Sequence, residues 1–221
     1  MEDHFYDRHD AGRKLAKSLE QYGGRDDVIV LALPRGGVPV GYEVAKALAA
    51  ELDVLTVRKL GVPHHPELAM GAIASGGAEY INTFVVETSG VSQWQINAAR
   101  AIEQEEMQRR EKLYRGNRPR PNLEDKIVIL VDDGMATGST MQAAIMALRS
   151  KKPKQIIVAV PVAPGEGASA FMDIVDGFVC LHRPATFMSV GQFYTVFDQT
   201  SDQEVRQLLA EHHKETAHVR G

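Results

Sequence analysis

The stretch "KIVILVDDGMATGSTM", which runs from Lys126 to Met141, decides the fold. Residues 127–131 are apolar without interruption, and two adjacent carboxylates, Asp132 and Asp133, follow directly. A short segment rich in Gly, Ala, Thr and Ser comes next. The continuous apolar run indicates a strand that is buried on both faces, as in a parallel sheet.

Similar apolar runs recur along the chain and alternate with segments of helical character. We expect strands at 27–33, 53–60, 126–131, 154–163 and 175–181, and helices at 9–22, 35–52, 92–116, 138–150, 165–174 and 201–215. This alternation predicts a doubly wound α/β fold with a mostly parallel sheet. Ligands of such folds bind beyond the carboxyl ends of the strands, near a topological switch point.

Composition narrows the class of protein. The 221 residues suit an α/β domain, and the net charge of −4 gives no general affinity for nucleic acid. The single cysteine, Cys180, excludes an internal disulfide and fits a reducing compartment. The N-terminus lacks an apolar signal core, and no apolar run is long enough to cross a bilayer. We therefore expect a cytoplasmic protein with no nucleic-acid or membrane partner.

The segment after the two carboxylates has the chemistry of a phosphate cradle. A helix that begins near Gly138 leaves its first N–H groups without partners and carries partial positive charge there. Thr137, Ser139 and Thr140 add hydroxyl donors. The carboxylates repel a phosphate, so they must face sugar hydroxyls or Mg²⁺, and a ribose 5-phosphate meets this description. The alternative is an acidic turn before an N-capped helix.

The motif "VILVDDGMATGST" closely resembles the phosphoribosyl pyrophosphate (PRPP) signature of type I phosphoribosyltransferases. The resemblance implies that Asp132 and Asp133 hold the ribose hydroxyls. It implies that the 5′-phosphate is bound by Ala136, Thr137, Gly138, Ser139 and Thr140. It also implies that residues 1–221 form one domain with a small C-terminal hood at about 180–205 and an inserted long helix at about 92–116.

Two further segments resemble this family. "LALPRGG" follows the first strand, where the family has a pyrophosphate loop with a cis peptide, and it supplies Arg35, Gly36 and Gly37. "VRKLG" resembles a strand end that brings a basic pair, here Arg58 and Lys59, to pyrophosphate. Strand alternation points these two side chains to opposite faces, so Lys59 alone is the stronger candidate for ligand contact.

The resemblance implies a Mg²⁺-dependent transfer of the 5-phosphoribosyl group from PRPP to a nitrogenous base or similar small-molecule acceptor, with release of pyrophosphate. Asp133, Arg35 and Lys59 are the candidate catalytic residues. No direct protein ligand to the metal is expected, because PRPP and water would hold Mg²⁺. Residues 61–77 have the Gly and Pro content of a lid, in which His64 and His65 are solvated, metal-binding or near pyrophosphate.

The hood, 180–205, is the candidate acceptor site. Its "PATFMSVGQFY" loosely resembles the hood of purine-salvage members, but Thr195 lies about where those members have an acidic residue. Phe187 and Tyr194 are the candidates for contact with the base. Alternatively, these aromatic residues only pack the hood onto the sheet.

Other functions stay open at this level. A PRPP- or nucleotide-sensing regulatory protein could use the same fold, and so could an enzyme with a non-nucleobase acceptor. Arg109, Arg110 and Arg115 of the helix at 92–116 either bind an acidic acceptor or form a solvated face. A homodimer is also an open alternative, because members of the family are commonly dimers.

Overall fold

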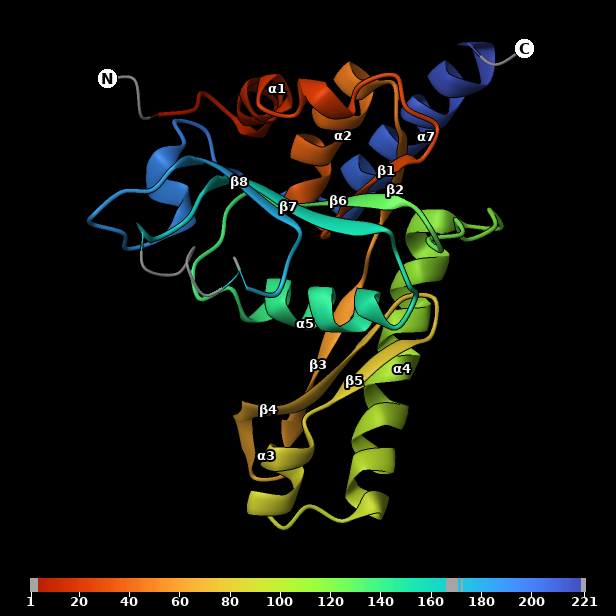
Figure 1. The fold of residues 1–221 in the computed structure, drawn as a ribbon, viewed down its shortest axis with the longest axis vertical. Coiled ribbons are helices and arrows are strands. Elements are labelled where there is room, and N and C mark those ends of the chain that lie inside the picture. The colour runs from red at the N-terminus through yellow and green to blue at the C-terminus, as the bar shows by residue number, and fades with distance from the viewer. Residues whose placement is uncertain (1–3, 166–170, 172, 220–221) are drawn as a thin grey trace. The chain divides into compact units, whose positions relative to one another are not determined.

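The structure is a computed structural model that describes residues 4–165, 171 and 173–219 (Figure 1). The chain divides into two compact units. The first unit comprises Met1–Val54, Pro121–Gly138 and Pro153–Gly221, and the second comprises Leu55–Arg120 and Ser139–Lys152.

The first unit is built on a five-stranded parallel sheet with the order β2-β1-β6-β7-β8 (Figure 1). Its strands are β1 (Val28–Ala32), β2 (Glu51–Val54), β6 (Ile127–Val131), β7 (Gln155–Val162) and β8 (Gly177–His182). Every residue of β1 and β6 is buried, and the two strands pair in register from Val28 opposite Ile127 to Ala32 opposite Val131. The predicted mostly parallel α/β fold is confirmed.

Among the described residues of this unit are three α-helices that pack together. They are α1 (Arg8–Lys17), α2 (Gly37–Leu48) and α7 (Asp202–Val219). The Asp7 carboxylate caps α1 by accepting a hydrogen bond from the Asp10 N–H at 2.7 Å, which satisfies one of the free amides of the first turn. The α2 helix lies against β1, β2 and β6, and both α1 and α7 pack on α2. The loop between β1 and α2 is thereby held at the end of the sheet.

His212 of α7 gives a pH dependence to the stability of this unit. It is 2% exposed, its Nε2 donates to the Ala50 carbonyl at 2.9 Å, and burial lowers its pKa below the ordinary value of 6.5. Protonation would place a hydrogen on Nδ1, which is buried and has no hydrogen-bond partner among the described residues. The unfolded chain therefore binds this proton at a higher pH than the folded one.

We predict that the contribution of His212 to stability is complete above pH 6.5 and is lost as the pH falls toward the folded pKa. Its largest effect on the free energy of unfolding is about 1.4 kcal/mol per pH unit. His212→Gln keeps a side-chain N–H for the Ala50 carbonyl but does not titrate. Urea denaturation between pH 5 and 8 should give a flatter profile for this variant, and an unchanged profile would contradict the assignment.

The second unit has a three-stranded antiparallel sheet with the order β3-β4-β5. Its elements are β3 (Val57–Val62), β4 (His65–Ala74), β5 (Ala78–Ile81), α3 (Thr83–Thr88), α4 (Gln93–Arg115) and α5 (Ser139–Arg149). The Ser92 and Gln95 side chains form a capping box at the start of α4, where the predicted long helix is confirmed. None of the helices in the described part of the chain is both long and apolar enough for a membrane span.

Three expectations about local structure were wrong or fall outside the description. Residues 53–60 form no single strand, because β2 ends at Val54 in the parallel sheet and β3 begins at Val57 in the antiparallel one. Most of 61–77, the predicted lid, belongs to regular strands, because β3 ends at Val62 and β4 is His65–Ala74. The helix predicted at 165–174 falls mainly on residues 166–170 and 172, which lie outside the described residues.

Candidate functional site

The switch point of the parallel sheet lies between β1 and β6. In the sheet, β2 lies beside β1 on one side, whereas β7 and β8 lie beyond β6 on the other side. From the neighbouring strands β1 and β6 the chain therefore continues in opposite directions. The carboxyl end of β1 leads into the loop with Arg35, and that of β6 leads into Asp132 and Asp133. Two of the predicted motifs therefore meet where α/β folds bind ligands.

Two glycines allow the motifs to approach each other. A Cβ atom on Gly36 would lie 2.6 Å from Cγ of Asp133, and a Cβ atom on Gly37 would lie 2.8 Å from the Val131 carbonyl oxygen and 2.9 Å from Cα of Asp132. All three distances are shorter than real Cβ atoms tolerate. At Gly37 both neighbours are backbone atoms, so close contact requires glycine there. The family resemblance implies a cis peptide in this loop where the basic residue precedes Gly, at Arg35–Gly36. The structure has the cis peptide one bond earlier, at Pro34–Arg35.

The acidic pair is electrostatically unusual. Burial raises the pKa of Asp132 well above its ordinary value, and the neighbouring carboxylate of Asp133 raises it further. The Asp133 N–H donates to Oδ1 of Asp132 at 2.9 Å, which fixes the orientation of the first carboxylate. Two carboxylates held together in this way are suited to accept hydrogen bonds from a pair of hydroxyls or to face a cation.

Arg8 is a site residue that the sequence did not reveal. Its Nε donates to Oδ2 of Asp133 at 2.8 Å, and its Nη1 donates to the Asp198 carbonyl at 2.6 Å. The guanidinium also stacks over the Phe197 ring, 3.9 Å from the centroid. Arg8 therefore holds the Asp133 carboxylate in place and offsets part of the charge of the pair.

Tyr194 supports the same acid from the hood. Its hydroxyl donates to the main-chain carbonyl of Asp133 at 2.6 Å, and its ring packs against Phe5 and Phe197 with centroids 5.4 Å and 4.9 Å apart. Burial raises the pKa of this phenol, and the Asp133 charge raises it further, so the hydroxyl remains a donor. Its predicted contact with an acceptor base stays a prediction.

We expect Tyr194→Phe to lower the free energy of unfolding by about 1 kcal/mol, because it removes the hydrogen bond that the buried Tyr194 donates to the Asp133 carbonyl. Tyr6→Phe is the matched control, since Tyr6 is 63% exposed and the same atom is removed. Urea denaturation of the two variants measures the difference. Equal midpoints for Tyr194→Phe and Tyr6→Phe would show that the hydrogen bond does not support Asp133.

The predicted phosphate loop continues from the acidic pair. Ala136 and Thr137 are exposed, and Gly138 has φ of 72°, a left-handed conformation that favours glycine. The α5 helix then begins at Ser139, and Ser139 and Thr140 are exposed in its first turn. The loop thus leads exposed hydroxyls into a helix N-terminus, as the motif predicts.

Arg35, the predicted pyrophosphate ligand, is half-exposed after β1. Its ion-pair partner among the described residues is Asp202. Oδ1 of Asp202 lies 3.9 Å from Nη1 of Arg35, which is a long distance for an ion pair. The Asp202 side chain is 45% exposed, so this pair contributes little energy and leaves the guanidinium available to an anion.

The basic pair of β3 divides between the two faces of the antiparallel sheet. Arg58 pairs with Glu103 of α4 at 2.6 Å between Nε and Oε2. Lys59 lines a pocket of about 120 Å³ with Ser139 and Gln142 of α5, within the second unit. The structure therefore brings Lys59 to the start of the helix that the phosphate loop enters, while Arg58 turns toward α4.

Sequence reasoning missed three polar residues of this pocket, namely Tyr80, Asn82 and Gln142. Tyr80 lies opposite Ala72 on the pocket side of the sheet, while the next residue, Ile81, packs in the apolar cluster against α4. This alternation between the two faces of a strand is the signal in the sequence that could have indicated Tyr80.

The hood is joined to the N-terminal segment. Phe5 donates its N–H to the Phe193 carbonyl at 2.8 Å, and Thr195 donates its N–H to the Phe5 carbonyl at 2.9 Å. Phe187 is half-buried and stacks on Phe193 with centroids 5.5 Å apart. Packing of the hood thus involves both aromatic candidates, and contact of Phe187 with an acceptor remains a prediction.

Among the described residues, no group of three or more His, Cys, Asp or Glu side chains gathers as a metal site. His64 and His65 are exposed, and His64 lies at the turn between β3 and β4 with φ of 66°. The carboxylate oxygens of Asp132 and Asp133 are of the kind that a hard cation such as Mg²⁺ prefers.

Comparison with known proteins identifies the family. The phosphoribosyl transferase domain family matches residues 3–178. Two Mycobacterium tuberculosis proteins provisionally named phosphoribosyl transferases are 46% identical over 213 residues, which are 96% of this chain and 48% of theirs. The chain thus spans about half the length of these relatives. The crystal structure of TT1426 from Thermus thermophilus is 37% identical, with a TM-score of 0.86, and the match covers 94% of this chain and 98% of that one. This chain therefore belongs to the phosphoribosyl transferase domain family.

Proposed function

We propose that this chain binds PRPP and transfers its 5-phosphoribosyl group to a nitrogenous base or similar acceptor, with release of pyrophosphate. One observation carries the proposal. The carboxylates of Asp132 and Asp133, at the end of β6, lie against the glycines of the loop that follows β1, at the switch point of the sheet. A sugar with adjacent hydroxyls and a pyrophosphate on its anomeric carbon fits acids and a glycine loop that meet in this way.

Each motif has a role in this proposal. Asp132 and Asp133 accept hydrogen bonds from the two ribose hydroxyls. The amides and hydroxyls of 136–140 bind the 5′-phosphate. Arg35 and Lys59 neutralise the departing pyrophosphate, with the amides of Gly36 and Gly37 beside it.

The reaction itself needs little covalent work from the protein. The bond between C1 of the ribose and the pyrophosphate oxygen breaks, and the oxygen leaves with the electron pair. The acceptor nitrogen forms the new bond to C1 and loses its proton, for which Asp133 is the nearest proposed base. The chain contributes by orienting the sugar and by stabilising charge on the leaving group.

Mg²⁺ fits the proposal as a companion of the substrate. PRPP oxygens and water would hold the ion, and the negative charge of Asp132 and Asp133 would favour its presence beside them. When bound, the ion supplies positive charge that stabilises the leaving pyrophosphate.

The proposal is tested by measuring pyrophosphate release from PRPP and Mg²⁺ with a panel of purines, pyrimidines and small amines. We expect release with at least one acceptor and none when the acceptor is omitted. Binding of PRPP without release across the whole panel would contradict the transfer reaction and favour the sensing function.

A further inference from the structure

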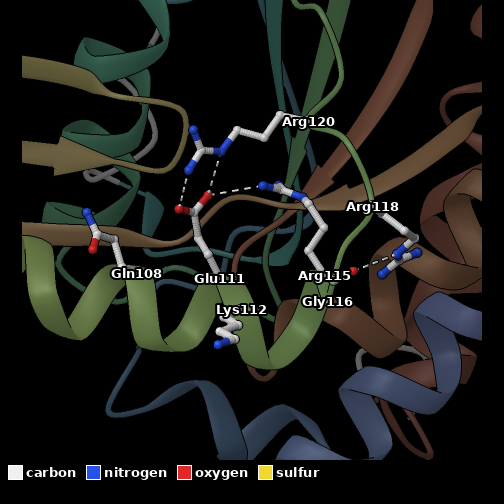
Figure 2. A pocket seen from close by; sticks show the side chains of 7 residues that line it. All are labelled: Gln108, Glu111, Lys112, Arg115, Gly116, Arg118 and Arg120. Carbon is white, nitrogen blue, oxygen red and sulfur yellow. Dashed lines mark hydrogen bonds and ion pairs between the residues drawn. The ribbon is translucent and has the colours of Figure 1, made fainter.

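A second cavity lies in the second unit, where α4 ends. It measures about 510 Å³, within the range of small-molecule sites. Figure 2 shows its lining residues, which are Gln108, Glu111, Lys112, Arg115, Gly116, Arg118 and Arg120. Lys59 and Ser139 line a different cavity, and the two share no residue.

The lining carries a surplus of positive charge. It contains three arginines, one lysine and a single carboxylate, that of Glu111. Glu111 is 6% exposed and accepts from Nη1 of Arg115 at 3.0 Å and from Nη2 of Arg120 at 2.8 Å (Figure 2). One carboxylate cannot balance the cations around it, so an anion in this cavity would find a favourable field.

The arginines are positioned rather than loose. Arg115 is 8% exposed, and the buried Glu111 carboxylate orients its guanidinium. Arg118 donates from Nε to the Arg115 carbonyl at 3.1 Å and from Nη2 to the Tyr114 carbonyl at 3.0 Å, so it is fixed across the end of α4. Guanidinium groups that are fixed at a cavity wall place their positive charge beside the cavity without further loss of side-chain entropy.

A fifth cation lies nearby. Cε of Lys151 and Cδ of Arg120 each lie 3.9 Å from the position that a Cβ atom on Gly76 would occupy. The aliphatic parts of these two basic side chains therefore border the same glycine, and Lys151 adds positive charge beside the cavity.

We propose that this cavity is a binding site for a polyphosphate, meaning a molecule with two or more linked phosphates. A phosphate chain carries a charge of about −3 to −4, which is similar in size to the surplus positive charge of the lining residues. Such a chain can also bind several guanidinium groups at once. The seven lining residues, all described in the structure, include no aromatic ring that could stack on a base. The site should therefore recognise the phosphate chain, whether it is inorganic or part of a nucleotide.

The experiment separates this cavity from the proposed PRPP site. Isothermal titration with tripolyphosphate is carried out in the Arg35→Gln/Lys59→Gln background, which lacks the proposed pyrophosphate ligands. We expect binding to persist there and to weaken about tenfold or more when Arg118→Gln/Arg120→Gln is added, because two charge-assisted contacts are lost. ATP and GTP should bind within about threefold of each other, and AMP far more weakly.

The matched control is Arg109→Gln/Lys17→Gln in the same background, which removes the same charge from two exposed side chains outside the cavity. It should change the affinity by less than about twofold, because both side chains are exposed outside the cavity, where water and salt screen their charge. Equal affinities with and without Arg118→Gln/Arg120→Gln, or AMP binding as tightly as ATP, would overturn the proposal.

Hydrogen exchange of the unmodified chain gives a second measurement that does not depend on the folding of a variant. Tripolyphosphate should slow amide exchange in peptides that cover 108–120, where α4 ends. An unchanged exchange rate in these peptides at a concentration that saturates binding would also overturn the proposal.

Discussion

Replacing both acids by their amides, Asp132→Asn/Asp133→Asn, is expected to abolish the stabilisation of this protein by PRPP and Mg²⁺. The unmodified chain should melt roughly 5–10 °C higher at a PRPP concentration about 100 times its Kd. The double variant should show no such shift, because each amide replaces a charged acceptor for a ribose hydroxyl by a neutral group that is partly a donor. Differential scanning fluorimetry with and without PRPP measures the effect.

The single variant Asp132→Asn tests whether the charge of the buried acid destabilises the folded chain. Burial and the neighbouring acid raise the pKa of Asp132, so its ionised form at neutral pH opposes folding. Asp132→Asn alone should therefore melt no lower than the unmodified chain in the absence of ligand. A full PRPP shift in the double variant would refute the roles proposed for the two acids.

Gly37→Ala is expected to have the second largest effect, on both stability and PRPP binding. The added methyl group would lie 2.8 Å from the Val131 carbonyl oxygen and 2.9 Å from Cα of Asp132, and neither atom belongs to a flexible side-chain end. The loop and the end of β6 must separate to accommodate it. We expect a loss of about 1–3 kcal/mol in the free energy of unfolding.

The loss of PRPP affinity should accompany that destabilisation, because the same displacement moves the proposed pyrophosphate loop away from the acids. Gly165→Ala is the matched control, since a Cβ atom there would meet no described atom within 4 Å. Chemical denaturation and titration with PRPP are compared for the two variants. If Gly37→Ala and Gly165→Ala behave alike, the close approach of the two loops has no functional importance.

The sequence predicted the parts of the fold that depend on local pattern. The uninterrupted apolar runs of β1 and β6 indicated buried parallel strands, and the polar residues 92–116 indicated the long helix α4. The position of Asp132 and Asp133 after a buried strand indicated the end of the sheet at which they lie. These features follow from neighbouring residues and from the geometry of single elements.

The parts that the sequence did not predict depend on contacts between distant segments. Arg8 reaches Asp133 across 125 residues, and the Tyr194 hydroxyl reaches the Asp133 carbonyl across 61. The sequence does not indicate that the chain passes from one sheet to the other after Val54, because the residues on both sides of this point favour strand. A single sequence contains no direct record of which distant residues meet, so such contacts become visible only in the folded chain.

The central claim is that the acids after β6 hold the ribose of PRPP beside the loop after β1. A crystal of the protein soaked with PRPP and Mg²⁺ tests it most directly. We expect both ribose hydroxyls on the carboxylates of Asp132 and Asp133, with the 5′-phosphate at residues 136–140. Density for PRPP elsewhere, with these carboxylates still bonded only to protein, would contradict it.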